Sequence, residues 1–305
     1  MAVATTVGFP YQLDKTIDTM FYDHLTEYPV EWNKLAKTNG KFVGGVITEA
    51  ESTGLGAMQE VGEGEATPFD SFSEGNKKSR TATEYKLGFQ VTQKMIEDEL
   101  FGVCMKMDKS LAKSAARNPE AKFWDLFNSG FATHLGMDGQ YVFDASGRTL
   151  LKTGDAQNNR PSTDAVLSET SYQASLEYMY KAKDQTGWPA MLRPRYLVVP
   201  VELATTAHIL LNTVQKPGSM DNDTNWMKDG VLNSSGVQVF VSRNLTSATA
   251  WFLLAEEHDF RLIWIRPTKL MKADDASTGN RLYYANQRFG TFCNETTGCY
   301  GTTGA

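Results

Sequence analysis

The sequence predicts an α+β fold, and three features carry that prediction. A glycine-rich stretch with few large apolar residues runs from Ser52 to Ala82, and the strand-like run 85–91 then leads straight into an acidic helix start. Between residues 167 and 255, strand patterns alternate with helix patterns, as in a mixed α and β domain. A long hairpin pattern follows. Regular structure is therefore expected on both sides of one long irregular excursion.

The composition is that of a folded protein without a dedicated nucleic-acid-binding domain. The 305 residues are 41% apolar, enough for one large or two connected domains. Acidic residues number 36 and basic residues 30, which argues against a strong grip on nucleic acid. The three cysteines, Cys104, Cys293 and Cys299, are a poor disulfide framework and suggest a reducing compartment, although Cys293 and Cys299 could pair. Residues 1–6 do not resemble a signal peptide, and no apolar run approaches the ~20 residues of a membrane span.

The first half of the chain holds the least regular patterns. Apolar residues between Asp18 and Leu35 predict a helix that Pro29 divides into two pieces, because proline disrupts a helix interior. The run 42–47 predicts a strand. The excursion 52–82 is too long and too polar to build a core of its own. It is either a floppy insertion or an extended hairpin arm that a neighbouring subunit orders.

A long helix is predicted after the strand 85–91. Thr92 is its expected N-cap, and residues 97–99 place three carboxylates where the helix dipole favours them. Asn118-Pro119 is expected to punctuate the helix, with Pro119 starting the next one. The residues of one predicted buried face are Ile96, Leu100, Val103, Met107 and Leu111, and a second stripe continues through Phe123, Phe127, Phe131 and Leu135. Such an aromatic stripe is typical of a core.

The second half shows clearer local signals. Ser168 is an expected N-cap, and Leu167 and Tyr172 stand at the two positions of a hydrophobic staple. Short apolar runs predict strands at 195–199, 237–241 and 251–255, and a helix is expected after Pro200. The runs 260–265 and 282–292 predict a hairpin around the polar turn 272–280, followed by a tail rich in glycine and threonine.

No pattern in the sequence predicts chemistry. The glycine clusters at 54–56 and 62–64 lack the further residues of a phosphate loop, and no zinc signature is present. The pair Asp274-Asp275 lacks the ligand spacing of a calcium loop. The four histidines are scattered at His24, His134, His208 and His258. We therefore predict no catalytic, cofactor-binding or metal site and no cofactor.

One segment resembles a known family. The run Leu87-Gly88-Phe89-Gln90-Val91-Thr92, followed by 96–100, is similar to the major head subunits of Mu-like phages. The sequences at 167–169 and 198–200 add further likeness, so the chain resembles the tailed-phage major capsid proteins of the Hong Kong 97 type. This resemblance spans nearly the whole chain. It implies an N-terminal arm over 1–46, an extended loop over 47–92, a spine helix over 93–135, an axial domain over 136–256, and a peripheral domain of the spine helix with the sheet and tail 257–305.

The resemblance also implies a structural function. The subunit would assemble as hexamers and pentamers into an icosahedral or prolate shell around phage double-stranded DNA, which it would contact weakly and without sequence specificity. Because the sequence begins with Met1, the scaffolding protein is expected to be separate. A portal is a further expected partner, and decoration proteins remain open. The protein would be part of the virion, assembled in the host bacterial cytoplasm without a membrane. Lys77 and Lys78 lie in the extended loop, but no partner for an isopeptide crosslink can be matched to them.

Two alternative interpretations remain open at the level of the sequence. An encapsulin-like nanocompartment shell has the same fold, although the long loop and separate N-terminal arm weigh against it. The other alternative, from a different class, is a cytoplasmic α/β enzyme, which enzymatic turnover by dispersed subunits would support.

Overall fold

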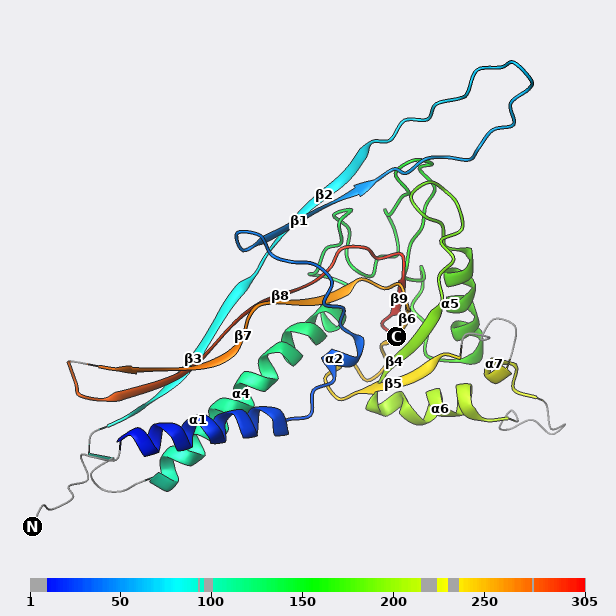
Figure 1. Ribbon diagram of the computed structural model, residues 1–305. Coiled ribbons are helices and arrows are strands. Elements are labelled where there is room, and N and C mark those ends of the chain that lie inside the picture. Colours follow the sequence, from blue (N-terminus) through cyan, green and yellow to red (C-terminus); the bar gives the residue numbers. More distant parts are fainter. Residues whose placement is uncertain are drawn as a thin grey trace, which may run out of the picture. The chain divides into compact units, whose positions relative to one another are not determined.

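The computed structural model describes residues 10–92, 94–95, 101–214, 224–229, 236–275 and 277–304 (Figure 1). The chain divides into two compact units, and each unit is assembled from three separate stretches of sequence. The first unit consists of Met1–Ile47, Arg80–Phe123 and Arg261–Thr291, and the second of Thr48–Ser79, Trp124–Phe260 and Phe292–Ala305. Among the described helices, none is both long enough and apolar enough to cross a membrane.

The first unit contains a three-stranded sheet in the order β3-β8-β7. Its strands are β3 (Thr83–Val91), β8 (Arg281–Cys293) and β7 (Phe260–Asp274), and β3 runs antiparallel to β8. Helices α1 (Pro10–Glu27) and α4 (Phe101–Asn128) supply the other core residues. Ile17 and Phe21 of α1, Leu111 and Ala115 of α4, and Tyr283 of β8 are all buried in one cluster. The predicted strand 85–91 and the predicted C-terminal hairpin are thus confirmed.

The predicted break near Pro29 is confirmed, but the helix before it begins at Pro10 rather than Asp18. Helix α1 ends at Glu27, and the short helix α2 follows at Trp32–Leu35. The start of α2 is capped from another element. The buried Glu120 of α4 accepts hydrogen bonds from the backbone N–H of Glu31 and, at 3.1 Å, of Trp32. These bonds satisfy amides that a helix start leaves without partners.

The predicted strand over 42–47 is confirmed only for Val46 and Ile47, the first residues of β1. Val43 pairs with Val46 around Gly44 and Gly45, whose φ angles of 61° and 84° place both in the left-handed region. Glycine adopts that region without steric cost, so the chain makes a tight turn here. The strand β1 begins after the turn, at Val46–Ser52.

The predicted capping bond of Thr92 is present at the helical residues 94–95, whereas α4 is described from Phe101 and its predicted buried face is partly wrong. Thr92 Oγ1 accepts a hydrogen bond from the Met95 N–H at 3.3 Å. Ile96, Leu100 and the carboxylates of 97–99 lie outside the described residues. Val103, placed on the buried face, is 42% exposed, and Met107 is only half-buried. Before Pro119, the residues that α4 buries are Cys104, Asp108, Leu111, Ala112, Ala115 and Ala116. Small alanines let neighbouring elements approach closely, and a search for large apolar residues overlooks them.

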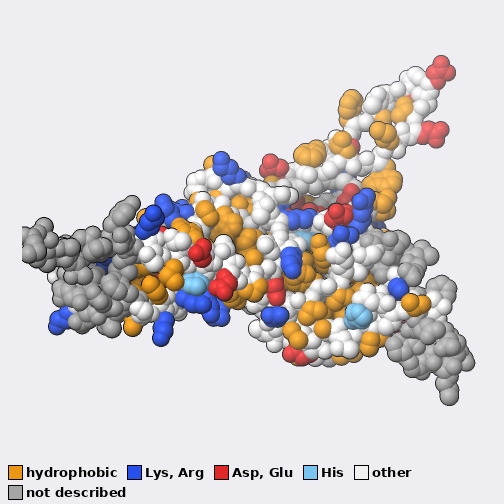
Figure 2. Space-filling view, turned by 60° about the horizontal axis from the view of Figure 1, so that its bottom comes forward, with side chains coloured by type: hydrophobic (Ala, Val, Ile, Leu, Met, Phe, Trp, Pro, Cys, Tyr) orange, Lys and Arg blue, Asp and Glu red, His pale blue; other side chains and the backbone are white. Residues whose placement is uncertain are grey.

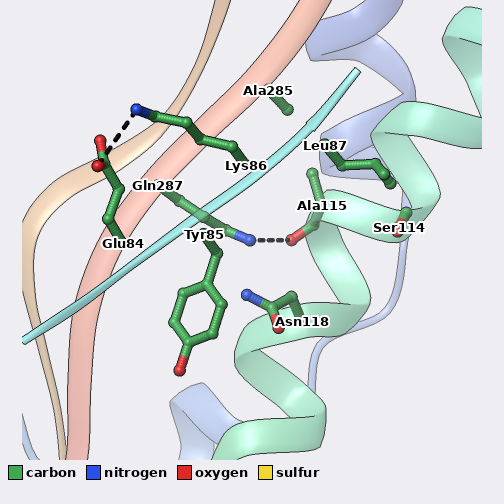
Figure 3. Close-up of a pocket in the computed structure, with 9 residues that line it drawn as sticks. All are labelled: Glu84, Tyr85, Lys86, Leu87, Ser114, Ala115, Asn118, Ala285 and Gln287. Carbon is green, nitrogen blue, oxygen red and sulfur yellow. Dashed lines mark hydrogen bonds and ion pairs between the residues drawn. The ribbon is translucent and has the colours of Figure 1, made fainter. Parts of the chain in front are cut away.

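The expected division of the helix at Asn118-Pro119 is also wrong, because Pro119 lies inside a continuous α4. Proline has no N–H, so the Ala115 carbonyl one turn earlier loses its usual intrahelical donor. The side chain of Gln287 on β8 donates to that carbonyl at 3.4 Å (Figure 3), and Thr268 donates to Gln287 Oε1 at 3.0 Å. This tertiary hydrogen bond compensates for the proline. The helix then continues to Asn128, and its residues Phe123 and Phe127 are fully buried, as the aromatic stripe predicts. Phe131 and Leu135, the other two residues of the stripe, lie beyond the end of the helix and are half-buried.

The second unit contains a four-stranded mixed sheet in the order β5-β4-β6-β9. β4 (Pro194–Pro200) lies parallel to β5 (Gln238–Ser242) and antiparallel to β6 (Trp251–Ala255), which pairs in turn with β9 (Cys299–Thr302). The helices are α5 (Glu169–Lys181), α6 (Ala204–Asn212) after the 3-10 turn η2 (Val201–Leu203), and α7 (Trp226–Asp229). All three predicted strands of this region and the helix after Pro200 are confirmed.

Two local features of the second unit differ in how well the sequence predicts them. Ser168 caps α5 through a reciprocal box with Ser171, and both Leu167 and Tyr172 are buried, as predicted. Strand β9 was not predicted. Its polar Thr302 is buried and donates a hydrogen bond to Asp164 at 2.9 Å, so burial of the hydroxyl is compensated.

Candidate assembly interface

The polar excursion forms a hairpin arm, defined here as β1, β2 (Glu74–Thr81) and the loop 53–73 between them. β1 and β2 make a two-stranded sheet of their own (Figure 1). The Thr53 N–H donates to the Ser73 carbonyl at 3.0 Å, and the hydroxyls of Thr48 and Ser79 are bonded at 2.9 Å. Of the two alternatives for this excursion, a floppy insertion and a hairpin arm, the chain adopts the hairpin.

The arm exposes its large apolar side chains. Met58 and Phe69 are almost completely exposed, at 102% and 95%, and Leu55, Val61 and Phe72 are also exposed. Figure 2 shows hydrophobic side chains along the arm and acidic ones at its end. Single exposed apolar residues are ordinary, but a group of them on one element marks an interaction surface. The arm therefore has the composition of a segment that buries its apolar residues against a partner.

Within the second unit, the arm is held mainly by polar contacts. Asp70 forms an ion pair with Lys152 and accepts the Gly56 N–H at 2.7 Å. The hydrogen bond from Lys152, aided by that from Gly56, lowers the pKa of the Asp70 carboxyl to about 2. Asn294 donates to Glu49 of β1 at 2.7 Å. Exposed ion pairs of this kind contribute little to stability because solvent screens them, so these contacts hold the arm lightly.

The first unit has a hollow between β3 and α4 (Figure 3). Its volume is about 420 Å³, and it is lined by Glu84, Tyr85, Lys86, Leu87, Ser114, Ala115, Asn118, Ala285 and Gln287. A second hollow of about 290 Å³ continues along the same strand past Gly88 and Phe89. β3 is an edge strand of its sheet. Asn118 Nδ2 is buried at the first hollow without a hydrogen-bond partner among the described residues. An edge strand beside a groove can receive an extended segment of another chain.

The residues that the sequence singled out as candidate ligands or bases are not brought together. His24 is hydrogen-bonded to Glu27 at 3.1 Å, and His134 to Asp125 at 3.0 Å. The scattered histidines also include the exposed His208 and the buried His258. Within the described ranges, no three His, Cys, Asp or Glu side chains gather in a way that could hold a metal ion.

The cysteines and the loop carboxylates have local structural roles. All three cysteines are free and buried. Cys293 donates to the Glu295 carbonyl at 3.3 Å and Cys299 to the Thr296 carbonyl at 3.1 Å. In the turn 272–280, Asp275 accepts hydrogen bonds from Ser277 and Thr278, and these lower its pKa to about 2. Asp274 is paired with Arg281 at 3.3 Å.

One titratable residue was missed at the level of the sequence. Asp108 lies on the inner face of α4, fully buried, and neither carboxylate oxygen has a hydrogen-bond partner among the described residues. Burial raises the pKa of Asp108 to about 6. The charge of His24 opposes this rise in pKa, and the charge of Asp18 adds to it. The sequence does contain a sign that Asp108 is buried. Residues 104, 108, 111 and 115 are spaced as one face of a helix, and this spacing places Asp108 among buried positions.

Comparison with known proteins identifies the family. The sequence profile of a family described as phage capsid protein matches residues 75–300. A comparison with curated protein sequences finds no match. Among solved structures, the capsid of the native GTA particle has a TM-score of 0.57 at 11% identity, with 90% of this chain and 91% of that chain covered.

Two phage capsids show the same likeness. The capsid of bacteriophage JBD30 has a TM-score of 0.53 at 17% identity, covering 72% of this chain and 92% of that chain. The capsid of Myoviridae phage XM1 has a TM-score of 0.51 at 13% identity, covering 88% of this chain and 89% of that chain. These likenesses establish the predicted Hong Kong 97 type fold, and neither they nor the family match favours the encapsulin-like or enzymatic alternatives. Because the family match extends over most of its length, the chain belongs to the phage capsid protein family, as a major subunit of a capsid shell.

Proposed function

We propose that this protein is a major head subunit that assembles as hexamers and pentamers into an icosahedral or prolate shell, encloses phage double-stranded DNA, and catalyses no reaction. Assembly takes place in the cytoplasm of the host bacterium, with a separate scaffolding protein and a portal as partners. Within the subunit, we assign 1–46 to an N-terminal arm, 47–92 to an extended loop, 93–135 to a spine helix, 136–256 to an axial domain and 257–305 to the rest of a peripheral domain.

The observation that carries this proposal is the exposure of apolar side chains along the hairpin arm. Met58 and Phe69 have little to pack against in a single subunit, and a neighbouring subunit would remove them from water. Each such contact is weak alone. In a closed lattice every subunit both gives and receives an arm, and these repeated contacts stabilise the shell together.

The proposal is tested by removing the arm's apolar side chains while keeping its backbone. In the double variant Met58→Ser and Phe69→Ser, we expect dispersed subunits to unfold at the wild-type temperature, because neither residue is buried within the subunit. Negative-stain electron microscopy should show few or fragile shells. Val43→Ser is the matched control, since Val43 is 77% exposed and lies outside the arm's strands and loop.

Two outcomes would contradict the proposed role of the arm. The first is normal shell formation by the double variant under conditions in which the control also assembles. The second is unfolding of the dispersed double variant, which would show that Met58 or Phe69 belongs to the fold of the subunit itself.

A further inference from the structure

The exposed face of α4 carries a basic stripe, defined here as Lys106, Lys109, Lys113 and Arg117. The four residues are spaced by three, four and four positions, which places them on one side of a helix. All four side chains are exposed. At a rise of about 1.5 Å per residue, the stripe is about 16 Å long. In the linear sequence these residues form no basic block, and only the helix aligns them.

The charges of the stripe are largely uncompensated. None of its three lysines has an ion-pair or hydrogen-bond partner within the described part of the chain. Arg117 lies over the ring of Tyr28, 5.6 Å from its centre, which leaves the guanidinium charged. The pKa of Glu27 on α1 is lowered by its hydrogen bond with His24 and by the charges of Lys109 and Lys113. Glu27 carries one negative charge against the four positive charges of the stripe, so this contact leaves an excess of positive charge.

The chemistry of the stripe favours a polyanion over a protein partner. Protein interfaces depend on buried apolar or aromatic anchors at their centre. Between Lys106 and Arg117 the one other exposed residue of α4 is Ser110, and Val103, one turn before Lys106, is a single exposed apolar residue, so the stripe has no cluster of apolar or aromatic anchors. Phosphate groups along a nucleic acid need none, because they bind rows of lysine and arginine through charge alone.

We propose that the basic stripe of α4 is the surface through which the subunit contacts the phosphates of packaged duplex DNA. This inference rests on the proposed function, which places double-stranded DNA inside the shell. The contact is weak for one subunit, since four cations are few and read no base. It therefore agrees with the weak, sequence-independent binding expected from the overall acidic composition. Repetition over many subunits makes the lining of the shell favourable for DNA without a tight grip at any point.

The salt dependence of binding gives the sharpest test. Each phosphate contact contributes about −0.9 to the slope of log affinity against log salt concentration, so four contacts give about −3.6. The binding of a labelled 20-base-pair duplex to dispersed subunits is measured between 20 and 100 mM salt. The double variant Lys106→Gln and Lys113→Gln should reduce the slope to about −1.8. The control variant Lys77→Gln and Lys78→Gln removes the same charge from β2 of the arm and should leave the slope unchanged.

Electron microscopy of the same variants separates failure of this inference from failure of the proposed function. Shells formed by the stripe variant, combined with the reduced slope, support the stripe as the DNA contact. If the stripe variant forms shells but keeps the wild-type slope, the inference is overturned while the shell function stands. The same holds if the stripe variant and the Lys77/Lys78 control lose the same amount of slope. Loss of shells with unchanged DNA binding shows that the stripe contacts an acidic protein surface instead. If wild-type protein forms no shells under any condition, the proposed function itself fails.

Discussion

Replacement of Asp108 by asparagine should remove a pH dependence from the stability of the subunit. The carboxyl is buried against α1 and has no hydrogen-bond partner among the described residues, so ionisation leaves an uncompensated charge. Burial raises its pKa from 3.8 to about 6. The folded subunit therefore holds the Asp108 proton more tightly than the unfolded chain does. Stability attributable to this group falls as the pH rises from about 4 to about 6, and the full penalty is present above that window.

The magnitude follows from the pKa difference between the folded and unfolded states. Two pKa units correspond to about 3 kcal/mol at neutral pH. Water penetration and relaxation of the side chain reduce this penalty, so we expect about 1–2 kcal/mol. In the Asp108→Asn variant, the gain in unfolding free energy should be largest at pH 7.5, smaller at pH 5 and absent near pH 3.5.

Urea unfolding of dispersed subunits at these pH values is the appropriate assay. At any one pH, the difference in unfolding free energy between Asp108→Asn and wild type includes the cost of burying an unpartnered amide. The change of this difference with pH does not include that cost. Asp23→Asn, which alters an exposed carboxylate of α1, is the control and should show no comparable trend. A difference between Asp108→Asn and wild type that stays constant from pH 7.5 to pH 3.5 would refute the reasoning.

Three further predictions concern packing in the first unit, and unfolding of dispersed subunits checks each of them. Leu111→Ala should lower the free energy of unfolding by about 2–5 kcal/mol because Leu111 is buried. Met107→Ala should lower it clearly less because Met107 is half-buried, and equal losses in the two variants would show that the assigned buried face is wrong. Gln287→Ala should cost about 1–3 kcal/mol by leaving the Ala115 carbonyl without a donor, and a cost near zero would mean that water replaces the side chain. Gly88→Ala should destabilise the β3–β8 pair, since the added methyl group would lie 2.6 Å from the Tyr283 carbonyl oxygen, and wild-type stability would contradict that contact.

The sequence predicts those parts of the fold whose signals are local. The capping of α5 by Ser168 and the strands β5 and β6 depend on a few neighbouring residues, and all of them are confirmed. Strand β9 could not be predicted from its own residues. The segment Cys299–Thr302 is short and rich in polar and small residues, and it is a strand because β6 offers it an edge.

Long-range compensation explains why the sequence predicts a break that the long helix does not have. Proline predicts a break whenever only the helix is considered, and nothing near Pro119 reveals that Gln287 will supply the missing donor. The candidate interface divides in the same way. The arm could be anticipated from its length and polarity. The groove beside β3 could not, because the edge position of that strand depends on its pairing with β8, far along the chain.

The interleaving of the two units in sequence has a consequence for synthesis on the ribosome. β8 is the middle strand of the first sheet and β9 closes an edge of the second, so residues after 280 are needed to complete both. A nascent chain that stops earlier lacks the partner of β3 and cannot finish either core. Truncated translation products should therefore stay unfolded and be cleared by proteases, so that the growing particle receives only subunits whose synthesis has passed this point.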